Sequence, residues 1–374
     1  MSIPFPDLLL DRARGIAETL PARIARANEH RDLDPDVIAA IEDADLFRLF
    51  RPRRFGGFEM APGHFYDIQN VFAERCLSTA WVYGVLSIQS FVLALFDARA
   101  QDDVWGTDPT ARVSSSFKPE GTVEPVDGGY RITGRWTFSS GSRHAGWALV
   151  GGLVPQAGAP PQMRLFLVPR ADYEIVDTWH TFGLRGTGSN DLRIEGAFVP
   201  THRSWQPTPG VTLSTARDIA PLYRLPWLFM FPSCIANLAI GAGRGAVKRL
   251  AQSCANAPAA AAEQVRLAIG RASRRIEAAN LLLQANVATM YAKAQRGEAL
   301  AASDAILYRS QLAAMLREIA AEVDTLMLHT GGRGISETGP LTQTWLDLCA
   351  ARHHMGNIPD GTTLGLADAL IEVA

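Results

Sequence analysis

The stretch from Asp177 to Pro200, DTWHTFGLRGTGSNDLRIEGAFVP, decides how the rest of the chain is interpreted. The apolar residues near its C-terminal end, from Leu192 to Val199, predict a strand. Gly183, Gly186 and Gly188 rule out a regular strand in its middle and let backbone come close to something flat or anionic. The same composition is also typical of a glycine-rich turn on a surface loop. The middle of the stretch adds one cation and three short polar side chains: Arg185, Thr187, Ser189 and Asn190.

A second stretch, Gly128 to Trp147, reads GGYRITGRWTFSSGSRHAGW. It predicts one strand before Gly134 and a second strand after it, with Trp136 and Phe138 on the same face. The second strand ends in a cluster of small residues: Ser139, Ser140, Gly141 and Ser142.

Together these stretches resemble the middle domain of the acyl-CoA dehydrogenase superfamily. More narrowly, they resemble its flavin-dependent monooxygenase branch, the oxygenase components of two-component aromatic hydroxylases. The resemblance rests on GGYRITGRWTFSSG, on DTWHTFGLRGTGS and on the closing FVP, and it extends in order over nearly the whole chain. It is therefore much more specific than a single glycine motif.

Length and composition limit the class of protein and the number of domains. A chain of 374 residues with 47% hydrophobic and 20% charged residues is typical of a globular protein with about two or three domains. The net charge of −2 gives no electrostatic footprint for nucleic acid. The most apolar run, Leu225 to Gly243, is interrupted by prolines and polar residues and does not predict a membrane span.

The cysteines and the N-terminus bear on location. Four widely spaced cysteines form no metal-binding pattern and fit a reducing compartment. The opening MSIPFPDLLL has no basic region or cleavage site, so a cytoplasmic protein without a metal site is expected.

The chain divides by composition into three predicted domains. Residues 1–108 predict an N-terminal helical domain, residues 109–208 a small antiparallel β-barrel or sandwich, and residues 209–374 a C-terminal four-helix bundle. This mostly α fold with a β middle domain is the order that the resemblance implies. The predicted helices are 8–27, 37–45, 65–74, 79–96, 98–105, 232–256, 260–295, 303–330 and 341–356. The predicted strands are 112–117, 130–133, 135–139, 147–153, 164–169 and 193–199, with 155–162 as a loop.

Two histidines, His353 and His354, close the last predicted bundle helix in DLCARHHMGNIPD. From the residues alone such a pair is structural or solvated. The resemblance implies a catalytic histidine in a motif of Asp, Arg and His, which Asp347, Arg352 and His354 match. His354 would then hydrogen-bond a flavin peroxide or take a proton from a substrate hydroxyl.

The resemblance also implies a set of flavin contacts. Ser140 would lie against flavin N5 and O4, and Phe138 would form an apolar wall along the ring. The alternative for Ser140 is a turn hydroxyl that bonds its own backbone. For the bundle loop that contains Gly331, Gly332 and Gly334, the alternative is a helix C-cap followed by a turn. The remaining cofactor-binding residues are predicted to be Ser115, Arg185, Thr187, Ser189, Gly331, Gly332 and Gly334, the last three approaching a flavin bound mainly by a neighbouring subunit.

Substrate binding is expected at Gln89, Ser90 and Ser115. Some aromatic hydroxylases place a phenol-binding histidine in the helix that corresponds to Leu86–Leu93, where this chain reads LSIQSFVL without one. The resemblance therefore implies an electron-rich ring, phenolic, indolic or polyketide-derived, and the missing histidine argues against a simple phenol.

The implied activity is that of an oxygenase component. It would take reduced FMN or FAD (FMNH2 or FADH2) from a separate flavin reductase and use O2, through a C4a-hydroperoxyflavin, to hydroxylate a small-molecule substrate. No strand–GxGxxG–helix unit for NAD(P)H is present, which agrees with a partner reductase. A homotetramer, a dimer of dimers, is also implied.

Two alternatives remain open. An acyl-CoA dehydrogenase with bound FAD would share the fold, but it needs a glutamate base in the bundle, and Glu337 matches that position poorly. A non-catalytic helical-bundle binding protein would bind flavin in neither redox state.

Overall fold

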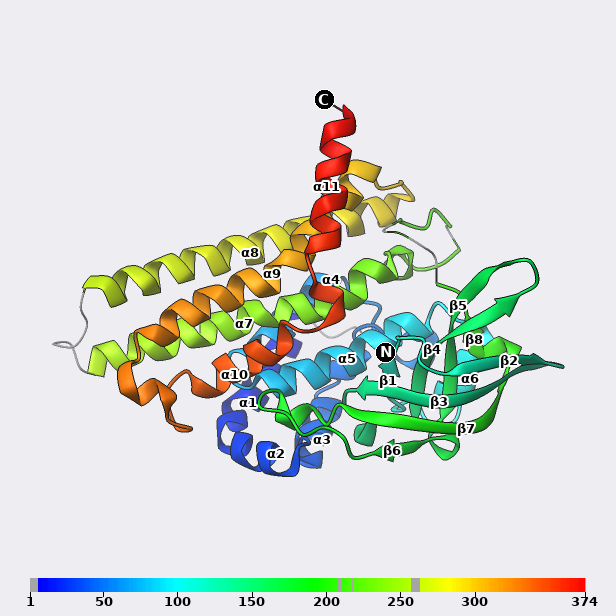
Figure 1. Cartoon of the computed structure of the whole chain (residues 1–374), viewed down its shortest axis with the longest axis horizontal. Helices are drawn as coiled ribbons and strands as arrows, with labels where there is room; N and C mark the ends of the chain where they lie inside the picture. Colours follow the sequence, from blue (N-terminus) through cyan, green and yellow to red (C-terminus); the bar gives the residue numbers. More distant parts are fainter. Residues whose placement is uncertain (1–5, 208–209, 211, 217, 257–262, 374) are drawn as a thin grey trace.

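The computed structural model describes residues 6–207, 210, 212–216, 218–256 and 263–373. Helices form both ends of the chain and strands form its middle (Figure 1). Within these residues no helix is both long and apolar enough to cross a membrane.

Between residue 6 and the first strand the chain forms six α-helices. They are α1 (Pro6–Thr19), α2 (Ile24–His30), α3 (Pro35–Asp43), α4 (Pro62–Ala73), α5 (Leu77–Leu93) and α6 (Ala98–Trp105). The prediction of one helix over 8–27 is wrong, because a 3-10 turn at Leu20–Arg23, with Pro21 near its start, separates α1 from α2. All 17 residues of α5 are buried, so this helix forms the centre of the molecule.

Two four-stranded sheets follow, ordered β1-β4-β5-β8 and β2-β3-β7-β6. Their inner faces share one hydrophobic core, which includes Trp136, Val150, Phe166 and Leu192, so they form a sandwich. The pairing is antiparallel except between β1 and β4, which are parallel. The strands are β1 (Val113–Ser116), β2 (Thr122–Val126), β3 (Gly129–Ser139), β4 (Trp147–Gln156), β5 (Ala159–Pro169), β6 (Glu174–Val176), β7 (Asn190–Pro200) and β8 (Ser204–Trp205).

Three details of the sandwich correct the sequence-based expectations. The two strands expected around Gly134 are one strand, β3, with a register shift between Ile132 and Gly134. The loop expected over 155–162 is the tip of the β4–β5 hairpin. Trp136 and Phe138 do not share a face: Trp136 is fully buried and Phe138 is 65% exposed. A second register shift before Ser139 and a φ of 64° at Phe138 turn that side chain outward.

The described residues 218–256 and 263–373 contain three long α-helices and two shorter ones. They are α7 (Trp227–Asn256), α8 (Glu263–Arg296), α9 (Ala302–Leu328), α10 (Thr342–Ala351) and α11 (Asp360–Val373). The helix predicted over 341–356 is present as α10 but is shorter than expected, because it ends at Ala351 and a 3-10 turn at Met355–Asn357 follows it. The sequence did not predict α11, which extends away from the bundle at the top of Figure 1.

The N-terminal and C-terminal helices share one hydrophobic core. Buried amide side chains join α4 to α7: Asn70 donates to Asn237, and Asn237 donates to Gln69. In Figure 1, α5 lies between the bundle and the sandwich. Side chains from the N-terminal helices, the sandwich and the C-terminal helices can therefore meet beside α5.

Candidate active site

The glycine-rich stretch links the sandwich to the bundle. After β6 it forms turns rather than a strand, as expected, and β7 begins at Asn190. Leu184 and Gly188 adopt left-handed conformations on either side of a 3-10 turn at Arg185–Thr187. A Cβ on Gly183 would lie 2.1 Å from the carbonyl oxygen of Leu346 in α10. The absence of a side chain at Gly183 therefore lets protein backbone approach, where the sequence suggested a flat or anionic partner.

Asp347 of α10 holds this stretch in place. Its buried carboxylate oxygen Oδ1 accepts hydrogen bonds from the backbone N–H of Leu184 at 2.6 Å and from Nε2 of Gln343 at 2.8 Å. Burial raises the pKa of Asp347 to about 7, despite these two donors. The carboxyl group thus fixes one left-handed residue of the loop against the bundle.

A chain of buried hydroxyl groups begins at that residue. Thr187 Oγ1 lies 2.9 Å from the carbonyl oxygen of Leu184 and 2.6 Å from Ser189 Oγ. Ser189 Oγ lies 2.6 Å from Ser140 Oγ, which accepts a hydrogen bond of 3.0 Å from the indole N–H of Trp81 in α5. All three hydroxyl-bearing residues are at most 8% exposed. Ser140 is therefore a member of a buried chain between the loop and α5, rather than a turn hydroxyl that bonds its own backbone.

An exposed aromatic edge lies next to Ser140. The ring of Phe138 packs edge-on against Trp179, with 6.1 Å between ring centroids. Phe138 is 65% exposed and has strained backbone, a combination that places a flat apolar surface two residues from the Ser140 hydroxyl. These groups suit a flat heteroaromatic ring that has a polar edge.

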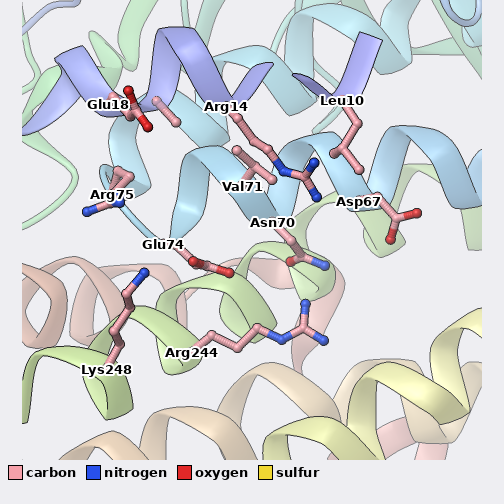
Figure 2. A pocket seen from close by; sticks show the side chains of 11 residues that line it. Leu10, Arg14, Glu18, Asp67, Asn70, Val71, Glu74, Arg75, Arg244 and Lys248 are labelled. Atoms are coloured by element: carbon pink, nitrogen blue, oxygen red, sulfur yellow. The ribbon is translucent and has the colours of Figure 1, made fainter. Parts of the chain in front are cut away.

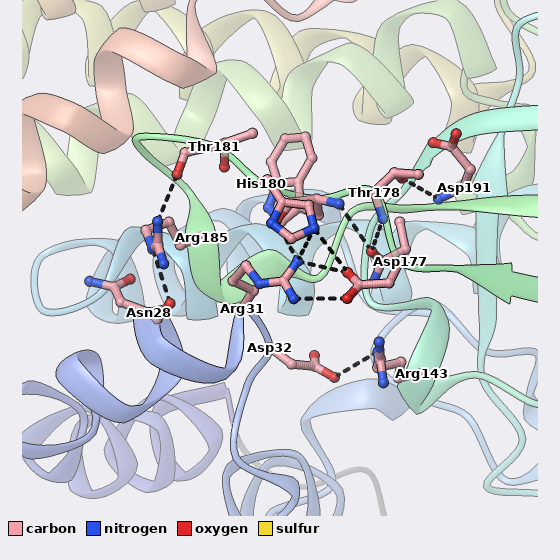
Figure 3. A network of polar contacts seen from close by, with 12 residues as sticks. Asn28, Arg31, Asp32, Arg143, Asp177, Thr178, His180, Thr181, Arg185 and Asp191 are labelled. Atoms are coloured by element: carbon pink, nitrogen blue, oxygen red, sulfur yellow. Dashed lines mark hydrogen bonds and ion pairs between the residues drawn. The ribbon is translucent and has the colours of Figure 1, made fainter.

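Arg185 does not face that surface. Its guanidinium donates to the carbonyl oxygens of Asn28 and Thr181, so it ties the loop to α2 (Figure 3). Nearby, Arg31 at the end of α2 makes a two-bond ion pair with Asp177 and contacts the ring of His180. The Arg185 guanidinium thus stabilises the glycine-rich loop and its contact with α2.

His354 lies on the other side of Trp81. The rings of Trp81 and His354 pack edge-to-face with centroids 5.6 Å apart, and Phe231 of α7 lies 6.1 Å from His354. Burial among these rings lowers the pKa of His354 to about 4, so the imidazole is neutral at neutral pH. Its Nδ1 accepts the N–H of Gly356 at 3.1 Å, which leaves the proton on Nε2.

His353 differs from His354 in position. Its side chain is exposed, and it lies in the turn after α10. The two neighbours therefore separate cleanly into one ring against the aromatic groups and one ring in solvent.

The other two motif residues act at different places. Arg352 pairs with Asp324 of α9 at 3.1 Å and contacts the sulfur of Cys349. Asp347 binds the loop through Leu184. In the contacts that the structure describes, Asp347, Arg352 and His354 each bind a different partner, so the motif fixes the end of α10 at three points.

The predicted substrate residues lie along α5 and β1. Gln89 donates to Ser115 Oγ at 2.8 Å, and the buried Oε1 of Gln89 has no hydrogen-bond partner. Ser90 is buried beside Gln89. Beyond the strand end, Phe117 packs on Phe231, the same ring that contacts His354. An unsatisfied acceptor and a series of aromatic rings thus lie on the His354 side of the molecule.

The three glycines of the bundle loop lie elsewhere. Gly331, Gly332 and Gly334 belong to a 3-10 turn that follows α9, and Gly331 and Gly332 are exposed. Gly331 has φ 62°, which suits a helix end followed by a turn. This turn, in orange, lies at the end of the bundle far from the sandwich in Figure 1.

A separate pocket of about 400 Å³ lies between α1, α4 and α7 (Figure 2). Its lining is mostly charged and includes Arg14, Glu18, Asp67, Glu74 and Arg244. It contains none of the predicted site residues and no aromatic ring, so it does not suit a flat cofactor. In the described parts of the chain, no group of three or more His, Cys, Asp or Glu side chains is arranged to hold a metal ion, and the four cysteines are free.

The sequence did not reveal Trp81 and Phe231. Trp81 joins the two halves of the site, since its N–H bonds Ser140 and its ring contacts His354. Nothing in the apolar sequence of α5 distinguishes it from its buried neighbours. A tryptophan is rarely buried without a partner for its N–H, and this is the one signal that could have drawn attention to it.

Known proteins are similar to this chain in sequence. Residues 233–359 match the family model "Acyl-CoA dehydrogenase, C-terminal domain". The flavin-dependent monooxygenase, oxygenase subunit HsaA, of Rhodococcus jostii is 36% identical over 94% of this chain and 95% of its own length. The FADH(2)-dependent resorcinol hydroxylase, oxygenase component, of a Rhizobium species is 32% identical over 96% of this chain and 93% of its own length.

Solved structures agree. The crystal structure of 3-HSA hydroxylase from Rhodococcus sp. RHA1 superimposes with a TM-score of 0.92 and 32% identity, covering 98% of this chain and 97% of the other. With its helical ends, β-sandwich and shared helical core, the chain has the acyl-CoA dehydrogenase fold. It is an enzyme that belongs to the family of flavin-dependent monooxygenase oxygenase subunits.

Proposed function

We propose that this protein is the oxygenase component of a two-component system that hydroxylates an aromatic substrate with reduced flavin and O2. The observation that carries the proposal is the connection of Ser140 and His354 through Trp81, beside the exposed ring of Phe138. Relatives named as a flavin-dependent monooxygenase subunit and as a FADH(2)-dependent hydroxylase component support it.

The residues divide into a cofactor side and a substrate side. On the cofactor side, Phe138 would lie along the flavin ring and Ser140 would bond its N5 edge. Thr187 and Ser189 would support Ser140 from behind. Bound reduced flavin would supply the two electrons with which one oxygen atom of O2 is reduced to water while the other is inserted into the substrate. The protein must keep water away from that reaction, and Trp81, Phe231 and Phe117 provide apolar walls for this purpose.

On the substrate side, the free Oε1 of Gln89 would accept a hydrogen bond from a ring hydroxyl or N–H, with Ser115 and Ser90 beside it. His354 would present Nε2–H to an oxygen atom in front of its ring, because Nδ1 is already engaged by Gly356. The alternative role, an imidazole that takes a proton from a substrate hydroxyl, would require the opposite tautomer. Hydrogen-bond donation by His354 is therefore the role we assign.

Several finer assignments belong to the same proposal. The flavin is FMN or FAD, delivered by a separate reductase in the cytoplasm. The chain assembles as a homotetramer in which Gly331, Gly332 and Gly334 approach the flavin of a neighbouring copy. The exposure of Gly331 and Gly332 in the turn after α9 agrees with such a role. A monomer in light scattering at micromolar concentration would contradict the tetramer.

The decisive experiment combines the purified protein with chemically reduced FMN or FAD, oxygen and a panel of phenols, indoles and polycyclic hydroxyaromatics. We expect a hydroxylated product from at least one ring class and little H2O2 when that substrate is present. Failure to bind reduced flavin would contradict the proposal, as would reduction of a dye with an acyl-CoA in place of hydroxylation.

A further inference from the structure

The hydroxyl chain Thr187–Ser189–Ser140 has a definite direction. Each of these side chains has one hydrogen to donate, and the chain ends at groups of fixed character. At one end the Leu184 carbonyl oxygen can only accept. At the other end the Trp81 indole N–H can only donate.

These ends determine every donor between them. Thr187 must donate to Leu184, because two oxygen atoms 2.9 Å apart without a hydrogen between them would repel. Ser189 must then donate to Thr187, and Ser140 must donate to Ser189. Both contacts are 2.6 Å, which is typical of a hydroxyl–hydroxyl hydrogen bond.

Ser140 is consequently left with acceptor capacity alone. Its hydrogen is committed to Ser189, and Trp81 occupies one of its two lone pairs. The second lone pair is free. Since the group is 8% exposed, little water is available to reverse this arrangement.

We infer that Thr187 and Ser189 make the site selective for reduced over oxidised flavin, by holding Ser140 as a hydrogen-bond acceptor. Reduced flavin has a hydrogen on N5 and donates there, whereas oxidised flavin has only a lone pair on N5. Ser140 therefore bonds the reduced form and meets the oxidised form with two facing acceptors. Thr187 and Ser189 act as positioning residues, and the inference rests on the proposed placement of flavin N5 at Ser140.

Thr187→Val tests this polarity without changing Ser140. It removes the acceptor of the Ser189 hydrogen, which then turns to Ser140, so that the Ser140 hydrogen is released toward the flavin. The Leu184 carbonyl keeps two donors, Trp179 Nε1 and the backbone N–H of Thr187, so the substitution leaves no orphaned carbonyl. Ser189→Ala releases the same hydrogen by a second route and serves if Thr187→Val folds poorly.

The measurement is the ratio of the dissociation constants for oxidised and reduced flavin. FMN and FAD are each titrated in air and, after reduction with dithionite, under nitrogen. We expect wild type to bind the reduced form more tightly and both variants to lower the ratio by about tenfold or more, since one neutral hydrogen bond is lost in one state and gained in the other. Thr187→Ser keeps the hydroxyl and should stay within about twofold of wild type.

Ser140→Ala provides the matched background. Without the Ser140 hydroxyl, adding Thr187→Val should leave the ratio unchanged, because the two residues act through the same atom. An unchanged ratio in Thr187→Val and Ser189→Ala, or an equal effect of Thr187→Val in the Ser140→Ala background, would overturn the inference while flavin binding stands. A wild-type protein that binds neither redox state would instead contradict the proposed function.

Discussion

Ser140 and His354 flank the same tryptophan but are held in different ways. Ser140 belongs to a buried hydroxyl chain in which each donor has an acceptor. In the described contacts, His354 accepts one backbone hydrogen bond and packs against the rings of Trp81 and Phe231. The hydrogen of Ser140 is thus oriented by other side chains, whereas the proton of His354 is placed by a single backbone N–H. The proposed cofactor side therefore depends on a network of side chains, and the proposed substrate side depends on one backbone turn.

Removing His354 should give the largest effect. His354→Ala removes the Nε2–H donor, and we expect hydroxylation to slow by about 10²–10⁴-fold, with H2O2 released in place of product. Product and H2O2 formed per reduced flavin are measured together. His353→Ala is the matched control, because its side chain is exposed one residue away. Equal losses in the two variants would show that the turn, and not the imidazole, matters.

Replacing Asp347, which holds the loop at Leu184, should lower the free energy of unfolding. Asp347→Ala leaves the Leu184 N–H without its partner in a buried site, at a cost of about 2–4 kcal/mol in the free energy of unfolding. Asp347→Asn retains an oxygen that can accept the same bonds and should cost less than half as much. Denaturant unfolding of both variants checks this, and equal losses would argue against the hydrogen bonds as the cause.

The sequence indicated candidate residues on both sides of Trp81, but not the partners that hold them. Local signals drew attention to Ser140, Ser189 and the paired histidines as candidates, and α6 has the predicted bounds. The partners of these residues were not predictable, because they come from distant segments: Trp81 is 59 residues from Ser140, and Asp347 is 163 residues from Leu184. The outward turn of Phe138 was also missed, since a strand's alternation does not reveal a register shift.

The pH dependence of stability gives a finer test of Asp347. Its folded-state pKa of about 7 is above that of an unfolded aspartate, so its contribution is fully present at low pH and is lost as pH rises through about 7. Relative to Asp347→Asn, wild type should lose up to about 1.4 kcal/mol per pH unit between pH 5 and 7. His354 is present in both proteins and cancels. Parallel stability curves for the two proteins would show that Asp347 is not titrating in this range.

Replacing Arg185 should have the smallest effect on the affinity for reduced flavin. Its guanidinium is bound to two backbone carbonyl oxygens, so Arg185→Ala should lower the free energy of unfolding by about 1–2 kcal/mol and leave the dissociation constant of reduced flavin within about twofold. Arg185→Lys keeps the charge and provides the control. A large loss of flavin affinity in Arg185→Ala that Arg185→Lys restores would return Arg185 to the cofactor side.

The shared core of the two helical regions has a consequence for synthesis on the ribosome. Asn70 in α4 is satisfied by Asn237 in α7, 167 residues later. At about 5–20 residues per second, on the order of ten to thirty seconds pass between the emergence of these two partners. During that interval the apolar faces of α4 and α5 have no α7 to cover them. We therefore expect the nascent chain to expose this apolar surface, and to need protection from aggregation, until α7 has left the exit tunnel.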